Sequence, residues 1–331
     1  MKVAFIGFQH GHISALYRRM VNDPVDWEIV AACEEDPIAA SFAEKTWGVT
    51  ITHTDFQAML DQVDFDVLAV GDYFSIRGAR VLEGLRRRKH IIADKPLCTS
   101  LEELDQIQNL ALDHDRKIGL MLDLRSNQKF VTAKQWIDAG KLGKIQSIHF
   151  CGAHSLNFAN RPKWYFEENK HGGVINDLAI HGLDMVEYLT GQKITELTAA
   201  RTWNAFAPQV PGFCDAAQMM FALENGCGVI GDASYIQPDE LTREAPFCWR
   251  FTLWGERGVM ELNCSPGGPI IVYGPTAKEE LLPCAVTDVP DYLQIYRDEL
   301  SGTPHLFGTD HILNLSRKTL QLQKKAILCN S

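Results

Sequence analysis

The chain has 331 residues, of which 46% are hydrophobic and 22% charged, a globular composition with enough length for two hydrophobic cores. Its net charge of −10 argues against nucleic acid or an anionic membrane as the main partner, because both require a basic surface. Nine scattered cysteines without a C-x-x-C pair fit a reducing compartment. With no signal peptide and no apolar run of bilayer length, we expect a cytoplasmic protein.

Strands and helices alternate over the first third of the chain. Short apolar runs predict strands at Val3–Ile6, Glu28–Cys33, Val67–Val70, His90–Ala93 and Lys117–Leu122. Helices are predicted near His12, over Pro37–Trp47 with a stop at Gly48, and after capping-box patterns that begin at Thr54 and Ser100. This alternation predicts an α/β domain over residues 1–122 with a doubly wound parallel sheet.

The pattern changes after about residue 123. Helices are predicted at Lys129–Ala139 and Asn176–Leu189, with a strand that begins near Lys144 between them. Strand-like segments then follow one another, at Ala216–Leu223, Gly228–Tyr235, Phe247–Trp254 and Val259–Leu262. Successive strands without helices predict an antiparallel sheet, so residues 123–331 are expected to form an α+β domain. A final helix is predicted at about 310–327, and this domain division allows it to pack back on the first domain.

The first predicted strand is followed by a glycine-containing turn that opens the first helix. Its residues are the candidate phosphate-binding set Gly7, Phe8, Gln9, His10, Gly11 and His12. A dinucleotide site needs such a turn so that the pyrophosphate lies at a helix N-terminus. In the usual G-x-G-x-x-G spacing, Gln9 occupies the second glycine position and His12 the third. A side chain at the second position hinders close approach of the backbone, so the motif alone is a weak signal.

An acidic residue at the end of the second strand supports the cofactor interpretation. Glu34 lies 27 residues after Gly7, near the spacing expected for a group that binds the adenosine ribose hydroxyls. Acids at both Glu34 and Glu35 would repel a 2′-phosphate, so NAD is favoured over NADP. The alternative is that these acids only decorate a strand end before a helix.

His10 and His12 also raise the hypothesis of a metal site, because a His-x-His pair in a turn can bind zinc. No third ligand is identifiable from the sequence. A position near phosphate at the start of a helix is the more economical account, and we expect no metal here.

Two segments carry candidate catalytic residues. Asp94 and Lys95 follow the fourth strand, at the carboxyl end where open α/β sheets place ligands, and the proline after Lys95 permits a cis bond. Asp177 and His181 are four residues apart in a predicted helix, so they share a face, and a carboxylate beside an imidazole suits general acid or base chemistry. The alternatives are that Lys95 is a surface lysine at a turn, that Asp177 is a capping aspartate and that His181 is a buried core histidine.

Together these motifs resemble the glucose–fructose oxidoreductase / myo-inositol dehydrogenase / MocA (Gfo/Idh/MocA) family. That family typically carries E-K-P and G-G-x-x-x-D-x-x-x-H-x-x-D, and this chain has Asp94-Lys95-Pro96 and Gly172-Gly173 followed by Asp177, His181 and Asp184. The resemblance covers essentially the whole chain. It implies a Rossmann domain, an α+β domain whose large open sheet often forms subunit contacts, and hydride transfer between NAD(P) and a hydroxyl carbon.

The resemblance also implies roles for single residues. His181 would exchange the hydroxyl proton, and Asp177 would orient His181 or bind substrate. Lys95 would stabilise the developing alkoxide. The loop from Asp72 to Arg77 would lie by the nicotinamide, and Trp164 is a loose match to a substrate-domain position. Asp94 replaces a glutamate and Arg77 a histidine, and we hypothesise that Arg77 binds an anionic group of substrate or cofactor.

The leading functional hypothesis is an NAD(P)-dependent dehydrogenase of a sugar, polyol or sugar acid. One alternative is a lyase or hydrolase of the same fold that retains NAD and oxidises its substrate transiently. Another is a non-catalytic ligand sensor, which the altered phosphate turn favours and the presence of Lys95, Asp177 and His181 opposes. An exposed antiparallel sheet makes a homodimer or homotetramer the expected assembly.

Overall fold

A computed structural model of the chain describes residues 1–241, 246–265, 268–274, 279–284 and 290–328. It divides into two compact units. The first unit contains Met1–Met121, Pro162–Gly172 and Tyr292–Ser316, and the second contains Leu122–Arg161, Gly173–Asp291 and Arg317–Ser331. The sequence predicted one boundary near residue 122. The first unit also includes two later segments of the chain.

In the described part of the first unit, five strands form a parallel sheet. They are β1 (Lys2–Ile6), β2 (Glu28–Cys33), β3 (Val67–Val70), β4 (His90–Ala93) and β5 (Ile118–Leu120), in the order β2-β1-β3-β4-β5. The predicted strands are confirmed, apart from one or two residues at the ends of β1 and β5.

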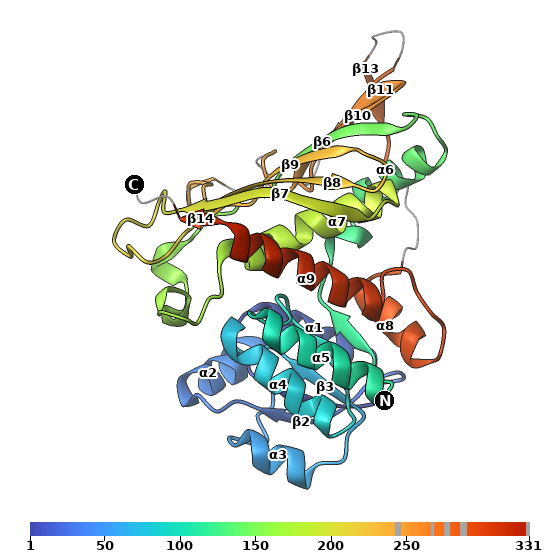
Figure 1. Cartoon of the computed structure of the whole chain (residues 1–331). Helices are drawn as coiled ribbons and strands as arrows, with labels where there is room; N and C mark the ends of the chain where they lie inside the picture. The colour runs from blue at the N-terminus through green and yellow to red at the C-terminus, as the bar shows by residue number, and fades with distance from the viewer. Residues whose placement is uncertain (242–245, 266–267, 275–278, 285–289, 329–331) are drawn as a thin grey trace. The chain divides into compact units, whose positions relative to one another are not determined.

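Helices cover both faces of this sheet (Figure 1). The helices of the first unit are α1 (His12–Val21), α2 (Pro37–Phe42) with a π-helical turn (Ala43–Trp47), α3 (Phe56–Gln62), α4 (Phe74–Arg86), α5 (Leu101–Asp113), α8 (Tyr292–Leu300) and the start of α9 (Thr309–Lys325). Val67 and Ala69 of β3 share a core with α1 and α8. Leu68 points the other way, where a Cβ on Gly84 of α4 would lie 2.9 Å from its Cδ2. The doubly wound arrangement is therefore confirmed.

Capping side chains and a glycine set several helix ends in the first unit. The Ser100 hydroxyl accepts a hydrogen bond from the Glu103 N–H at 3.0 Å, so the capping box before α5 is confirmed. Before α3 the cap is Asp55, which accepts from the Ala58 N–H at 2.7 Å, and not Thr54. Gly48 ends the π-helical turn in the left-handed conformation, as expected for a helix stop.

The strand order creates a switch point between β1 and β3, since β2 lies on one side of β1 and β4 on the far side of β3. In such sheets ligands bind outside the carboxyl ends of the strands that flank the switch point. Gly7 follows β1 at this place with φ +80°, and a Cβ on it would lie 2.4 Å from the Asp72 amide nitrogen after β3. Only glycine permits this approach of the two backbones.

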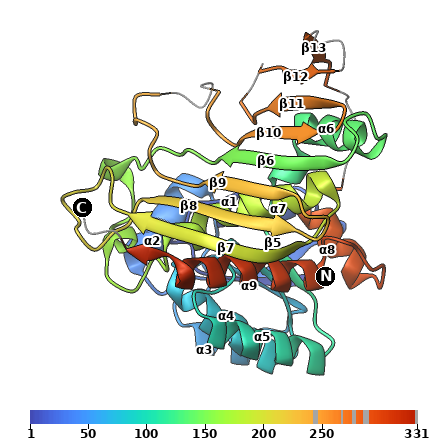
Figure 2. The same cartoon turned by 45° about the horizontal axis from the view of Figure 1, so that its top comes forward.

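The second unit contains a large mixed sheet, shown in Figure 2. Among the described residues its nine strands run in the order β13-β12-β11-β10-β6-β9-β8-β7-β14, and only the β6–β9 and β7–β14 pairs are parallel. The strands are β6 (Ile145–Cys151), β7 (Ile194–Trp203), β8 (Ala216–Leu223), β9 (Gly228–Asp232), β10 (Arg250–Gly255), β11 (Gly258–Leu262), β12 (Ile270–Tyr273), β13 (Glu279–Leu282) and β14 (Ile327–Leu328). The expected α+β unit with a mostly antiparallel sheet is confirmed.

The helices of the second unit are α6 (Gln128–Asp138), a π-helical turn (Ile175–Ala179), α7 (Ile180–Thr190) and the end of α9. Short 3₁₀ turns lie at Leu124–Ser126 and Phe158–Asn160, and another in the first unit at Lys163–Phe166. On one face of the sheet, Gly182 of α7 packs against the Phe150 ring of β6. Met220 and Ile230 are cross-strand neighbours that are about half exposed, at 48% and 50%.

The eight described cysteines are free, and Cys329 lies outside the described residues. None of the described helices combines the length and the apolar character needed to cross a membrane.

The close approach at Gly7 predicts a specific cost for a side chain. We expect Gly7→Ala to lower the free energy of unfolding by about 3 kcal/mol, because the backbone must stay in the left-handed region and the new methyl group meets Asp72. Urea unfolding measures this. Gly11→Ala is the matched control, since a Cβ there meets only Trp47 at 3.8 Å, and its effect should stay within about 0.5 kcal/mol. Equal losses in the two variants would contradict this account of Gly7.

Candidate functional site

The candidate cofactor residues of the first unit gather at the carboxyl edge of its sheet. The phosphate turn (Gly7–His12) follows β1, Glu34 follows β2, Asp72 follows β3, and Asp94 and Lys95 follow β4. Each of these strands ends at the same edge because the sheet is parallel. Residues separated by up to 84 positions in the sequence are therefore in contact there.

Arg77 of α4 lies at the centre of this edge and is fully buried. Its guanidinium forms an ion pair with Asp94, with Nη2 at 2.8 Å from Oδ2. The remaining donors bind main-chain carbonyls of the loops after β3 and β4: Gly71 and Asp72, both at 2.9 Å, and Asp94, Lys95 and Pro96. Every N–H group of the Arg77 guanidinium therefore donates to an acceptor within the chain.

This geometry corrects the role hypothesised for Arg77. A side chain with no exposed surface and with all its donors engaged cannot also bind a carboxylate or phosphate of a ligand. The sequence showed an arginine near the expected nicotinamide loop but not the carbonyls that surround it. Arg77 instead fixes the two loops in place and supplies the counter-charge for Asp94. Burial by itself raises the pKa of Asp94, but Arg77 and the neighbouring imidazoles hold that pKa well below its ordinary value.

Glu34 closes the phosphate turn against β2. One carboxylate oxygen accepts a hydrogen bond from the Phe8 N–H, and the other accepts from the Asp36 N–H at 2.9 Å. Burial raises the pKa of Glu34, and the two amide donors counter part of that effect. Each oxygen keeps a second acceptor position, so the carboxylate can still accept from a hydroxyl.

Glu35 points to a different partner, Arg80 of α4. The Arg80 guanidinium contacts the Glu35 carboxylate and also lies 3.3 Å from Asp72 through Nε. Its charge is therefore balanced by two acids next to the end of β2. An arginine in this area is what typically receives a 2′-phosphate, so its neutralisation bears on cofactor choice.

His10 connects the phosphate turn to Asp94 and to an aromatic segment. Its Nδ1 contacts Asp94 Oδ2, and its Nε2 lies 3.2 Å from the Tyr165 hydroxyl. Burial lowers the pKa of His10 to about 3, so the imidazole is neutral at physiological pH. The adjacent Trp164 donates from Nε1 to the Gln9 carbonyl at 3.2 Å. The segment Pro162–Gly172 thus packs against the altered turn of the same unit.

Lys95 lies beside these aromatic rings. Its Nζ is 5.9 Å from the centre of the Phe74 ring, which also packs edge-on against Trp164 and Tyr165. The side chain is 3% exposed, and the Lys95–Pro96 peptide bond is cis, as the sequence allowed.

In the second unit, Asp177 and His181 do not share one regular α-helix. Asp177 lies in the π-helical turn and His181 in the first turn of α7, and such turns occur frequently at functional sites. The Asp177 carboxylate accepts a hydrogen bond from the Tyr235 hydroxyl. The His181 ring packs edge-on against Trp249 at 5.6 Å, and Asp184 pairs with Arg125 at 3.0 Å.

The double glycine before this turn has a packing reason. Gly173 has φ +98°, and a Cβ on it would lie 2.2 Å from the Gln323 side chain. Gln323 in turn accepts a hydrogen bond from the Ile175 N–H at 3.0 Å through Oε1. The glycine therefore lets α9 secure the start of the segment that carries Asp177.

Sequence reasoning missed Tyr235 and Trp249 as neighbours of the candidate catalytic pair. Tyr235 lies 58 residues from Asp177, a contact that no local spacing reveals. Trp249 is buried with φ +46°, a conformation that is rare for a bulky residue. Its ring lies against Gly152, where a Cβ would come within 2.6 Å.

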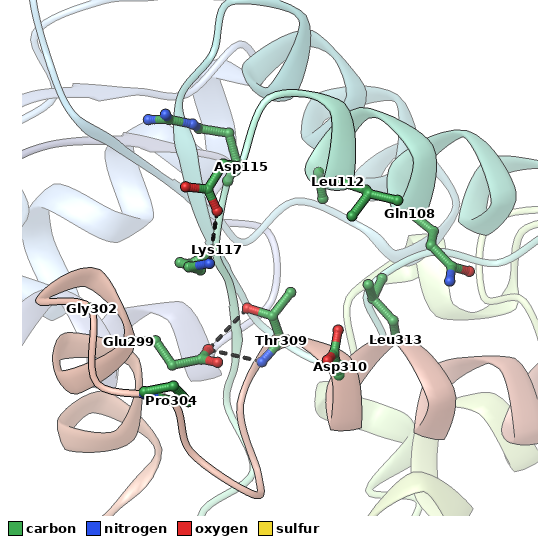
Figure 3. Close-up of a pocket in the computed structure, with 12 residues that line it drawn as sticks. Gln108, Leu112, Asp115, Lys117, Glu299, Gly302, Pro304, Thr309, Asp310 and Leu313 are labelled. Carbon is green, nitrogen blue, oxygen red and sulfur yellow. Dashed lines mark hydrogen bonds and ion pairs between the residues drawn. The ribbon is translucent and has the colours of Figure 1, made fainter.

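A separate pocket of about 300 Å³ opens at the opposite edge of the first unit, between the end of α5 and the α8–α9 connection. Figure 3 shows Lys117 beside Asp115, at 2.9 Å, and Glu299 accepting from the Thr309 N–H and hydroxyl. Lys117 precedes β5, so this pocket lies at the amino ends of the strands and away from the phosphate turn. It contains none of the residues predicted for catalysis or cofactor binding.

The ion pair of Arg77 with Asp94 predicts a large loss of stability when the cation is removed. Arg77→Met should lower the free energy of unfolding by about 3–5 kcal/mol, because Asp94 would remain buried without its counter-charge. Arg86→Ala is the control, since Arg86 is half exposed and its pair with Glu83 should contribute less than about 1 kcal/mol. Chemical denaturation of the two variants distinguishes them, and a fully stable Arg77→Met protein would refute the structural role.

Comparison with known proteins places the chain in a family. Residues 1–121 match the oxidoreductase family with an NAD-binding Rossmann fold, and residues 130–261 match the Gfo/Idh/MocA C-terminal domain. The chain is 26% identical to D-glucoside 3-dehydrogenase of Escherichia coli (strain K12), over 70% of this chain and 62% of that protein. It is also 26% identical to levoglucosan dehydrogenase of Pseudarthrobacter phenanthrenivorans, over 55% and 48%. The matches thus span about half the length of these curated relatives.

A solved structure shows the same fold. The inositol dehydrogenase homolog of Azotobacter vinelandii, complexed with NAD⁺, superposes with a TM-score of 0.78 at 18% identity, covering 98% of this chain and 95% of that one. The two family matches together include more than half of the 331 residues, which agrees with the resemblance seen in the motifs. The chain belongs to the Gfo/Idh/MocA family of oxidoreductases and carries that family's NAD-binding Rossmann fold.

Proposed function

We propose that the chain is an NAD-dependent dehydrogenase that transfers a hydride between the nicotinamide and a hydroxyl carbon of a sugar, polyol or sugar acid. The observation that carries the proposal is the assembly at the carboxyl edge of the first sheet. There the phosphate turn, Glu34 and Lys95 lie at the switch point where this fold class binds nucleotides. The sugar and polyol dehydrogenases among the relatives support the substrate class.

The residues present fit a dinucleotide. Gly7 lets the backbone after β1 approach the backbone at Asp72 more closely than a Cβ would allow. The helix α1 begins directly after Gly11. Its N-terminus would receive the pyrophosphate, while Glu34 would accept from the ribose hydroxyls. Gln9 and His12 take the place of glycines, but their backbone is held by Trp164 and by the start of α1.

Cofactor choice follows from the charges at the end of β2. Glu34 is buried there, and Glu35 together with Asp72 balances the charge of Arg80. A 2′-phosphate would add negative charge beside these carboxylates, and the nearby cation that the structure describes, Arg80, is already paired with two acids. NAD is therefore the cofactor that we propose over NADP.

Three side chains are proposed for the chemistry. When bound, the nicotinamide accepts or gives the hydride. Lys95 of the first unit places a positive charge where an alkoxide develops. In the second unit, His181 exchanges the hydroxyl proton. Asp177 accepts a hydrogen bond from the Tyr235 hydroxyl and orients His181 or binds substrate.

The open face of the second sheet supports self-association. Met220 and Ile230 lie side by side on neighbouring strands and are about half exposed. Exposed apolar side chains on an uncovered sheet face commonly mark protein contacts. We propose a homodimer or homotetramer, and retain a cytoplasmic location as a prediction from the sequence.

Cofactor choice can be tested by calorimetric titration of the purified chain with NAD⁺, NADP⁺, NADH and NADPH. We expect tighter binding of NAD(H), and Glu35→Ser should reduce this preference about tenfold, or by about 1.4 kcal/mol, because Arg80 loses an acidic partner. Glu83→Ser, a change of a surface acid on α4, should preserve it. Equal affinity of the wild type for NADH and NADPH would contradict the charge argument. Binding of none of the four would favour the sensor alternative.

The proposed reaction can be tested by NADH formation from NAD⁺ with panels of polyols, sugars and sugar acids. With an active substrate, Lys95→Met should lower kcat about 10²–10³-fold and His181→Asn about 10²–10⁴-fold. Lys134→Met, which removes a surface pair with Asp138, should leave kcat unchanged. Substrate conversion without net NADH formation would overturn the dehydrogenase proposal in favour of lyase or hydrolase chemistry.

A further inference from the structure

His10, His12 and Asp94 form a cluster of potential metal ligands in the first unit. One ligand atom from each of the three lies within 4.8 Å of the others. The two histidines come from the phosphate turn and the start of α1, and the carboxylate follows β4. From this juxtaposition we propose a binding site for a divalent transition metal ion, with zinc as the reference ion. The proposal does not depend on the dehydrogenase activity.

One oxygen of Asp94 carries the argument. The carboxylate is fully buried, and its Oδ2 is engaged by Arg77 and His10. Its Oδ1 has no hydrogen-bond donor among the described residues, although His12 Nδ1 lies at 3.3 Å. Buried carboxylate oxygens normally have a partner, so an orphaned oxygen beside the His12 imidazole points to a cation between the two groups.

The ligand types suit zinc and similar ions. Zinc binds imidazole nitrogen and carboxylate oxygen, and three protein ligands leave a fourth position for water or an oxygen-containing ligand. His12 supplies an opening to solvent, since its side chain is 54% exposed, while the other two ligands are buried. The site therefore resembles an open metal centre more than a closed structural one.

The surroundings also supply the outer contacts that metal ligands usually have. Arg77 holds Asp94 Oδ2 at 2.8 Å and leaves Oδ1 to face His12. If His10 gives up its contact with Asp94 Oδ2 and binds the metal through Nδ1, its Nε2–H donates to the Tyr165 hydroxyl at 3.2 Å. Such partners orient ligating imidazoles. The charge of Arg77 opposes a second cation nearby, so the affinity should be below that of a closed zinc site.

The test is zinc binding by the full-length chain after removal of metals with EDTA and dialysis. Competition with a chromophoric chelator gives the affinity for zinc, and cobalt(II) serves as the spectroscopic probe. We expect one ion per chain and a cobalt d–d spectrum of nitrogen and oxygen ligands. His12→Ala should weaken binding at least about tenfold, and Tyr165→Phe about 10–100-fold through loss of the outer contact.

The controls separate this site from other sources of binding. His53→Ala removes a histidine whose Nδ1 contacts Thr52 at 2.8 Å, outside the cluster, and should bind zinc as the wild type does. Unchanged affinity in His12→Ala, with wild-type circular dichroism, would overturn the proposal and indicate an adventitious ion only. Cobalt–thiolate charge-transfer bands would also overturn it, by assigning the ion to cysteines. Absence of binding in the wild type would do the same.

Discussion

The buried ion pair of Arg77 with Asp94 is the constraint on which the carboxyl edge of the first sheet depends. Arg77 joins the loops after β3 and β4 through five main-chain carbonyls, and Asp94 then orients His10. A buried pair of this kind is not itself strongly stabilising, but its disruption leaves an unpaired charge. The Arg77 guanidinium therefore holds Lys95, the phosphate turn and Asp72 in place, because all of its donors bind the two loops and Asp94.

Much of the fold could be predicted from local signals. The apolar runs identified β2, β3 and β4 to the residue, because buried parallel strands are continuous apolar segments. The helix α4 was missed, since Gly78 and Gly84 weaken its helical pattern. Those glycines pack closely against Glu103 and against Leu68, and these contacts are visible only in three dimensions.

The residues of the candidate site were proposed from the sequence, and the structure shows which contacts each of them makes. The motif residues were identified by their type and by their positions at strand ends, whereas their partners come from distant parts of the chain. Asp177 was paired with His181 by helical spacing, yet the π-helical turn intervenes and Tyr235 supplies a partner. Likewise, His10 and His12 lacked a third ligand until β4 brought Asp94 beside them. The departures from the family pattern at Arg77, His12 and Asp94 thus meet at one carboxylate.

We propose that the nicotinamide cofactor binds at the switch point at the ends of β1 and β3. Hydrogen–deuterium exchange of the 331-residue chain, with and without saturating NADH, tests this placement. We expect protection of amides in peptides that contain the phosphate turn, Glu34 and Asp72. Binding of NADH without protection there, or with protection concentrated around the pocket at Lys117 and Glu299, would contradict it.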